Sequence, residues 1–257
     1  MVELNKIYNE DCLEGMKLIP DKSIDMILCD LPYGTTQCTW DSVIPFDKLW
    51  AQYERIIKDN GAIVLTGSQP FTTDLINSNR KLFRYEIIWE KTQKLGFYDA
   101  NRRPLKGHEN ILIFYKKQPI YNPQKYNVTE KSRVRKQTGS RYVGYGDSNI
   151  GEYIYDGTRY PHSVIKISNW NGALFGDNSK ATKHPTQKPV LLFEWLIKTY
   201  TNEGMVILDN CMGSGTTAIA CINTGRNYIG FENDANYYHM AIDRVQKHLI
   251  EKTAGIS

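Results

Sequence analysis

A short motif at the end of an apolar run carries groups that suit the recognition of an amino group. The segment from Asp30 to Gly34 contains Leu31, Pro32 and Tyr33. The Asp30 carboxylate can accept a hydrogen bond from an exocyclic N–H, and the Leu31 carbonyl, held by the rigid proline ring, can accept another. The face of Tyr33 can stack on a planar base, which typically contributes ~1–3 kcal/mol. The motif therefore predicts a pocket for a base, although Pro and Gly also mark ordinary strand-to-loop turns.

A glycine-rich turn lies much later in the chain, between an apolar run and a helix of small residues. Such a turn lets the backbone approach a ligand and presents unpaired N–H groups at the start of the helix. Its spacing matches neither of the glycine patterns that are typical of nucleotide-phosphate loops. The candidate ligand-binding residues of this turn are Asp209, Gly213, Ser214, Gly215 and Thr216.

The next predicted strand ends in an acid, Glu232, which is followed by Asn233. Glu232 lies seventeen residues after Gly215. An acid near this spacing suits hydrogen bonds to the hydroxyls of a ribose. The alternative is a surface acid at the end of a strand.

A third polar group, His184 to Pro189, precedes a predicted helix. The segment brings a hydroxyl, an amide and an ammonium to the N-terminus of that helix, a place that favours anions, and its candidate site residues are His184, Thr186 and Lys188. The carboxylate of an amino-acid cofactor would suit this site. Taken alone, the segment is equally compatible with a capped helix start.

Alternating strands and helices must position these groups. Short apolar runs predict buried strands at 23–29, 62–65, 85–89, 110–115, 205–208 and 228–231, and helices are expected at 46–58, 190–200, 216–223 and 237–250. This alternation is typical of a doubly wound α/β sheet that is mostly parallel. The strands at 85–89 and 110–115 could instead pair in antiparallel fashion, and the sequence leaves this open.

The stretch 116–183 departs from this pattern. It holds twelve Lys and Arg against five acids, a net charge of +7 compared with +4 for the whole chain. Several tyrosines are interleaved with the basic residues, which favours a nucleic-acid surface over a merely solvated insertion. Candidate DNA-contacting residues here are Arg133, Arg135, Lys136 and Arg141, and a second basic stretch adds Lys91, Lys94, Arg102, Arg103 and Lys106.

With these motifs in this order, the chain resembles the β-type, circularly permuted DNA amino-methyltransferases that use S-adenosyl-L-methionine. The resemblance covers nearly the whole chain and implies a Rossmann-like methyltransferase fold. It implies one methyltransferase domain over 1–257, with a catalytic half at 1–115, an inserted target-recognition region at 116–183 and a cofactor-binding half at 184–257. Departures from the family pattern are Leu31, where a proline is usual, and Asn210-Cys211, where Pro-Phe is common.

The resemblance also implies roles for particular residues. Asp30, Leu31, Pro32 and Tyr33 would form the catalytic motif, and Asp30 would also lie against the cofactor. Asp11 and Cys12 would approach the adenine of the cofactor, although the former could simply end an edge strand. The resemblance favours N6 of adenine, because its cytosine-N4 members more often carry Ser at the position of Asp30.

Three rival functions remain at this stage. They are a cytosine-N4 DNA methyltransferase, an RNA adenine-N6 methyltransferase and a DNA-binding module without activity. Cytosine-C5 chemistry would need a cysteine nucleophile, normally presented in a Pro-Cys dipeptide, and the chain has none.

The bulk composition fits these expectations. The chain has 257 residues, 41% of them hydrophobic, and five cysteines without a C-x-x-C pair. We therefore expect reduced thiols, no structural metal and a cytoplasmic location. No apolar run approaches the ~20 residues that a membrane span needs. Expected partners are double-stranded DNA, a second copy of the chain in a homodimer, and a restriction endonuclease in a restriction-modification pair.

Overall fold

The computed structural model describes residues 2–34, 42–127, 157–169 and 187–255. The chain forms two compact units. The larger unit combines Met1–Asn122 with Ser163–Ser257, and the smaller one is Pro123–His162.

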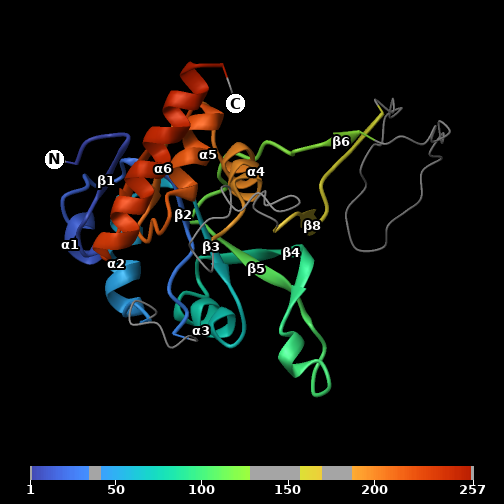
Figure 1. The fold of residues 1–257 in the computed structure, drawn as a ribbon. Coiled ribbons are helices and arrows are strands. Elements are labelled where there is room, and N and C mark those ends of the chain that lie inside the picture. Colours follow the sequence, from blue (N-terminus) through green and yellow to red (C-terminus); the bar gives the residue numbers. More distant parts are fainter. Residues whose placement is uncertain (1, 35–41, 128–156, 170–186, 256–257) are drawn as a thin grey trace, which may run out of the picture. The chain divides into compact units, whose positions relative to one another are not determined.

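An eight-stranded sheet forms the centre of the larger unit (Figure 1). The strand order is β1-β10-β9-β2-β3-β5-β4-β8, and only β5 runs antiparallel to its neighbours. The strands are β1 Lys6–Tyr8, β2 Ile24–Cys29, β3 Ile57–Gly67, β4 Phe83–Leu95, β5 Lys106–Phe114, β8 Val164–Ile167, β9 Val206–Asp209 and β10 Asn227–Phe231.

Helices cover both faces of this sheet. One face carries α1 Cys12–Met16, α2 Phe46–Ile56 and α3 Phe71–Ser78, and the other carries α4 Val190–Tyr200, α5 Thr216–Thr224 and α6 Ala235–Thr253. The expected doubly wound, Rossmann-like α/β architecture is therefore confirmed.

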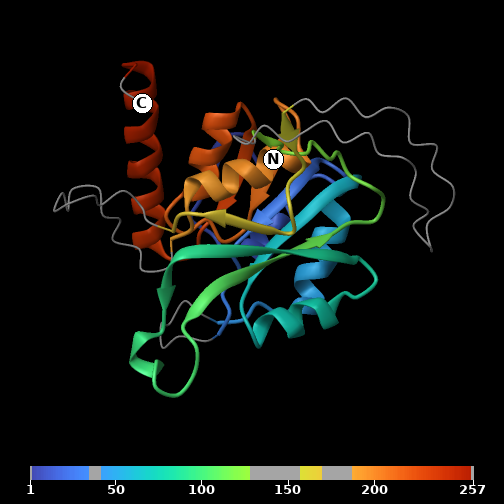
Figure 2. The ribbon, with the colours of Figure 1, turned by 90° about the vertical axis from the view of Figure 1, so that its right-hand side faces the viewer.

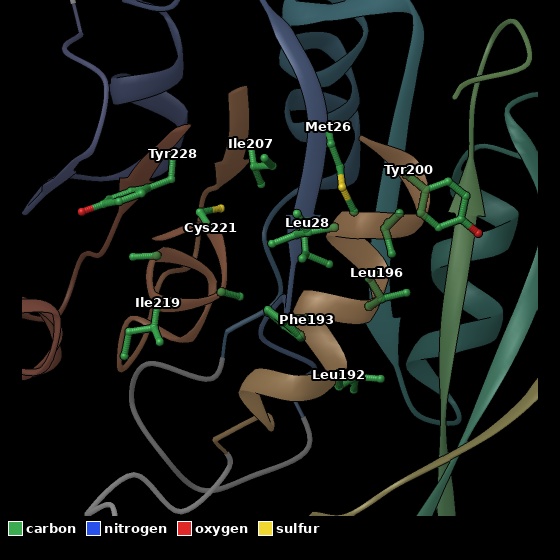
Figure 3. Packing of buried hydrophobic residues seen from close by; sticks show 14 of the residues in the cluster. Met26, Leu28, Leu192, Phe193, Leu196, Tyr200, Ile207, Ile219, Cys221 and Tyr228 are labelled. Carbon is green, nitrogen blue, oxygen red and sulfur yellow. The ribbon is translucent and has the colours of Figure 1, made fainter. Parts of the chain in front are cut away.

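Alternation along β2 shows how the two cores are built. Met26 and Leu28 pack toward α4 and α5, whereas Ile27 and Cys29 pack toward α1 and α2. All four side chains are fully buried, and Figure 3 shows the first pair beside residues of α4 and β9. A strand covered on both faces needs apolar residues at every position, which explains the continuous run read from the sequence.

Each predicted strand and helix overlaps an observed element of the same type, although the predicted ranges 23–29, 46–58, 110–115 and 205–208 extend one or two residues beyond it. The antiparallel alternative is also confirmed, since β4 pairs with β5 in that sense. The sequence did not predict β1, α1, α3 or β8. Because β8 joins the sheet beside β4, part of the stretch 116–183 belongs to the larger unit rather than to an insertion.

The smaller unit is described only in part. Its strands β6 Tyr126–Asn127 and β7 Thr158–Arg159 pair in antiparallel fashion. The Lys125 ammonium lies 4.8 Å from the centroid of the Tyr160 ring. Of the four candidate DNA contacts in the basic stretch 116–183 (Arg133, Arg135, Lys136 and Arg141), none falls within the described residues.

Candidate active site

A cavity of about 710 Å³ opens where the carboxyl ends of β2 and β9 lie side by side. The chain leads from β2 to β3 on one side of this pair and from β9 to β10 on the other side. The strand order therefore reverses here, at what is called a switch point. Such a switch point leaves a crevice outside the strand ends, where ligands bind in open α/β sheets. The first motif and the glycine-rich turn both line this cavity, so the topology brings together residues that are far apart in sequence.

Asp30 sits at the end of β2 and is held from several sides. Its Oδ1 accepts a hydrogen bond from the Tyr33 hydroxyl at 2.7 Å and another from the Thr66 hydroxyl. The Tyr33 ring stacks on Phe71, with centroids 5.0 Å apart. Burial, helped by the negative charge of Asp30, raises the pKa of Tyr33 well above its usual value, so the hydroxyl remains a donor.

The second oxygen of Asp30 is paired with Lys188. The Lys188 ammonium lies 2.5 Å from Asp30 Oδ2 and 3.4 Å from Glu109 Oε2. Burial alone would lower the pKa of Lys188, but the two carboxylates outweigh this effect and raise it. Lys188 is therefore charged, and its contacts are with acids of the protein, which differs from the expectation that it faces a cofactor carboxylate.

Lys91 also differs from its expected role. Its side chain is 6% exposed and its ammonium is paired with Glu109 Oε1. A buried, paired ammonium is not placed to contact a DNA phosphate, so the assignment of Lys91 as a surface contact is wrong. The neighbouring Lys94, Arg102, Arg103 and Lys106 lie on the β4–β5 hairpin and are exposed, as expected.

The glycine-rich turn closes over the end of β9. Gly213 and Gly215 adopt positive φ values of 54° and 82°, conformations that glycine reaches without strain. A Cβ on Gly215 would also meet the Ala241 backbone at 3.3 Å. Gly215 is thus required for the close packing of the turn on α6, whereas its neighbours on the turn line the cavity.

Glu232 ties the turn to the end of β10. Its Oε2 accepts the Gly213 N–H at 2.7 Å and its Oε1 accepts the Asp234 N–H at 2.9 Å. These bonds hold the carboxylate at the cavity wall while leaving lone pairs for further donors. Burial raises the pKa of Glu232.

The N-terminal segment also lines the cavity, through Asp11 and Cys12. Asp11 caps α1 by accepting hydrogen bonds from the Leu13 and Glu14 N–H groups. Its neighbour Cys12 lies beside Cys211, and both thiols are within 3.6 Å of the Asn210 amide nitrogen. The alternative in which Asp11 merely ends a strand is wrong, because this residue begins a helix.

The structure brings most of the predicted site residues to one cavity. The residues that line it are Asp11, Cys12, Asp30, Leu31, Pro32, Tyr33, Lys91, Lys188, Asp209, Gly213, Ser214, Thr216, Glu232 and Asn233. His184 and Thr186 lie outside the described residues.

Several residues of the site were not predicted from the sequence. Glu109 and Trp89 line the cavity from β5 and β4, and Thr66 holds Asp30 from β3. Arg244 of α6 donates to the Ser214 carbonyl at 2.9 Å and so fixes the glycine-rich turn. One feature of the sequence could have indicated two of these positions: a charged residue at the end of an apolar run. Glu109 directly precedes the run 110–114, and Lys91 lies two residues after Trp89.

No cluster of three or more His, Cys, Asp or Glu side chains in the described ranges could hold a metal ion. Within the same part of the chain, no helix is both long and apolar enough to cross a membrane.

Comparison with known proteins identifies the family. Residues 24–243 match the family N6_N4_Mtase, described as DNA methylase. The chain is a member of this DNA methylase family. The match spans both motifs at the cavity, so the predicted resemblance to DNA amino-methyltransferases is confirmed.

Characterised relatives of this DNA methylase cover nearly its full length. It is 29% identical to the Type II methyltransferase M1.MboII of Moraxella bovis, over 94% of this chain and 96% of the relative. It is 27% identical to the DNA adenine methyltransferase YhdJ of Escherichia coli (strain K12), over 95% and 83% of the two chains.

Solved structures agree on the fold. The complex of M1.HpyAVI with SAM superposes with a TM-score of 0.61 at 24% identity, covering 93% of this chain and 98% of the other. The cytosine-N4-specific PvuII DNA methyltransferase gives 0.64 at 15% identity, over 98% and 93%. The similarity to a cytosine-N4 enzyme means that the fold alone does not separate the two target bases.

Proposed function

We propose that this DNA methylase transfers a methyl group from S-adenosyl-L-methionine to N6 of an adenine turned out of double-stranded DNA. The proposal rests above all on one observation: Asp30 and Glu232 line the same cavity at the switch point of the sheet. A base-holding motif and a cofactor-holding turn that share a cavity can bring a nitrogen and a methyl donor together.

The residues present fit the cofactor. One side of the cavity is lined by Gly213 and its neighbours on the glycine-rich turn, by Glu232 after β10 and by the capped start of α1. We assign Glu232 and Asn233 to the ribose, Asp11 and Cys12 to the adenine, and Asp30, Asp209 and the turn 213–216 to the remainder. We assign His184 and Thr186 to the amino-acid end, but not Lys188, because its ammonium pairs with Asp30 and Glu109. When bound, S-adenosyl-L-methionine supplies a methyl group activated on a sulfonium.

The first motif binds the other reactant, the target base of the DNA. Asp30 and the Leu31 carbonyl accept the two N–H groups of the target amine and orient its lone pair, while Tyr33 stacks on the ring. Positive charge grows on the nitrogen during attack, and the Asp30 carboxylate stabilises it. Turning the base out of the duplex costs a few kcal/mol, which contacts in the cavity offset.

Adenine is proposed over cytosine for two reasons. The first motif carries Asp30 rather than Ser, and the relative YhdJ is named a DNA adenine methyltransferase. A cytosine-N4 enzyme remains the alternative, because the PvuII enzyme shares the fold.

We further propose that the DNA backbone contacts the β4–β5 hairpin and the recognition region 116–183. Lys94, Arg102, Arg103 and Lys106 are exposed on the hairpin. By analogy with the Type II methyltransferase relatives, we propose a restriction-modification context with a partner endonuclease. A homodimeric state and a cytoplasmic location are further parts of the proposal.

Mass spectrometry of DNA treated with the purified protein and S-adenosyl-L-methionine tests the choice of base. We expect 6-methyladenine, and 4-methylcytosine alone would contradict the assignment. Methyl transfer to RNA that equals or exceeds transfer to duplex DNA would contradict the choice of nucleic acid.

The variant Asp30→Ala tests the catalytic role. We expect a loss of turnover of roughly a hundredfold or more, because a group that stabilises developing charge is removed. Cofactor binding measured by calorimetry should survive. The matched control is Asp25→Ala at the other end of β2, which breaks the 2.6 Å pair with Lys58 outside the cavity. Retained turnover in Asp30→Ala would refute the proposal.

A further inference from the structure

Three buried charged side chains and the partly exposed Asp30 meet at the wall of the cavity. Asp30 follows β2, Lys91 belongs to β4, Glu109 belongs to β5 and Lys188 lies two residues before α4. Because β5 runs antiparallel to the other strands, its first residues lie at the same edge as the carboxyl ends of β2 and β4. We call these four residues the charge cluster. Its two negative and two positive charges sum to zero.

The Lys188 ammonium lies where the proposed function puts the amino group of the base. It donates to Asp30 Oδ2 at 2.5 Å and lies 5.7 Å from the centroid of the Tyr33 ring. Asp30 Oδ1 is already engaged by Tyr33 and Thr66. A base that stacks on Tyr33 and donates to Asp30 therefore competes with Lys188 for the same oxygen.

Glu109 provides a second position for this ammonium. Its Oε2 is buried and has no hydrogen-bond partner among the described residues, yet it lies only 3.4 Å from Lys188 Nζ. Its Oε1 is held by Lys91, which fixes the carboxylate in place. The side chains of Lys188 and Glu109 are 7% and 11% exposed, so an ammonium that left Asp30 without a new partner would be an uncompensated buried charge.

We propose that Lys188 is a positioning residue that occupies the amino site beside Asp30 and transfers its ammonium to Glu109 when the target base enters. No covalent bond changes in this exchange. Lys188 keeps its proton, one N–H turns from Asp30 Oδ2 to Glu109 Oε2, and the base amine takes the vacated oxygen. The inference rests on the proposed function, since it requires a base amine at Asp30.

A comparison of Glu109→Gln in two backgrounds tests the exchange, with single-turnover methylation as the measurement. The neutral amide cannot compensate the positive charge of the ammonium, so we expect the methylation rate to fall about tenfold or more, with the cofactor dissociation constant changed by less than about twofold. Glu109→Asp keeps the charge and should recover part of the rate. The matched control is Glu86→Gln, an equal change of charge on the adjacent strand β4, outside the cavity.

The Lys188→Met background separates the exchange from a structural role. Without the ammonium there is nothing to relocate, so Glu109→Gln should change the single-turnover rate by less than about threefold there. If Lys188→Met does not fold, Lys188→Gln takes its place, because its amide can satisfy Asp30 but carries no charge that needs Glu109 as a new partner.

Two results would overturn the inference: a rate for Glu109→Gln close to that of the unmodified enzyme, or an equal loss in both backgrounds. If the unmodified protein does not methylate DNA, the proposed function itself fails. If it does, and Glu109→Gln is equally active, only the exchange fails.

Discussion

Asp209 is an ionisable group that the fold removes almost completely from water. The residue is 2% exposed at the end of β9. Its carboxylate accepts hydrogen bonds from the Thr217 hydroxyl and from the Cys211 N–H at 3.0 Å. Burial nevertheless raises the pKa of Asp209 to about 6, because the two bonds offset only part of the lost hydration.

This raised pKa makes the stability of the protein depend on pH. Between its ordinary value and about 6, Asp209 binds a proton in the folded state more readily than in the unfolded state. Its contribution to the free energy of unfolding is therefore present below the ordinary pKa and is lost as pH rises through about 6. The full change is on the order of 2–3 kcal/mol.

The variant Asp209→Asn should remove this dependence. The measurement is the free energy of unfolding by urea denaturation, taken as the value for the unmodified protein minus the value for Asp209→Asn. We expect this difference to be larger at pH 4 than at pH 7. The control Asp59→Asn changes an exposed carboxylate that pairs with Lys22. A difference between Asp209→Asn and the unmodified protein that is equal at both pH values would contradict the expected contribution.

At the same scale, the sequence predicted the chemistry of single residues better than their partners. Asp30, Glu232 and the glycine-rich turn carry recognisable types at recognisable spacings. The pairing of Asp30 with Lys188 joins residues 158 positions apart, and no local pattern encodes such a contact. Lys91 was misplaced for the same reason: only the antiparallel register, which sets Trp89 opposite Glu109, shows that its ammonium faces an acid.

The β4–β5 hairpin is the element with the most exposed large side chains. Its tip contains the short helix η1 Phe97–Asp99, in which Phe97 is 80% exposed and Tyr98 is fully exposed. Figure 2 shows the hairpin extending beyond the rest of the sheet. Arg103 pairs with Asp99, a contact that is expected to contribute little because both groups are near solvent.

The double variant Arg102→Ala/Arg103→Ala tests the proposed contact between this hairpin and DNA. Loss of two phosphate contacts should weaken binding and reduce the slope of log affinity against log salt concentration by roughly two. The control is Arg80→Ala/Lys81→Ala, which changes two exposed cations just before the other end of β4. An unchanged slope, measured by fluorescence anisotropy over a salt series, would exclude the hairpin as a backbone contact.

Element length explains which parts of the fold the sequence predicted. Runs such as 205–208 and 228–231 are buried on both faces and bounded by polar residues, so their type and place were clear. By contrast, β1 has three residues and α1 has five, too few to show a periodicity. The strand β8 was missed because it lies in a basic stretch whose composition is typical of a loop, although Ile165 is buried in the sheet.

At the scale of the whole molecule, the division into two units suggests separate tasks. The described residues of the cavity all belong to the larger unit. The smaller unit, 123–162, holds seven Lys and Arg against four acids, a net charge of +3, compared with +1 for the rest of the chain. We therefore propose that the larger unit binds cofactor and base, and that the smaller unit contributes to the choice of DNA sequence.

Replacement of residues 128–157 by a short Gly-Ser turn tests this division. The closure is feasible because Asn127 pairs directly with Thr158. We expect the shortened protein to keep cofactor binding and cooperative thermal unfolding but to lose methylation at its specific site, as read by modified-base sequencing. Site-specific methylation at the original rate would show that this segment does not choose the sequence.

The pairing of β1 with β10 has a consequence for synthesis of the protein. Lys6 aligns with Ile229, and Asn5 donates to the Tyr228 carbonyl, so the strand that leaves the ribosome early waits for a neighbour made more than two hundred residues later. Because Asp11 and Cys12 follow that strand, the part of the cavity wall that they form is assembled only after translation has passed β10. A chain that stops before β10 lacks both the partner strand of β1 and Glu232, so the wall of the cavity that Asp11, Cys12 and Glu232 line cannot form.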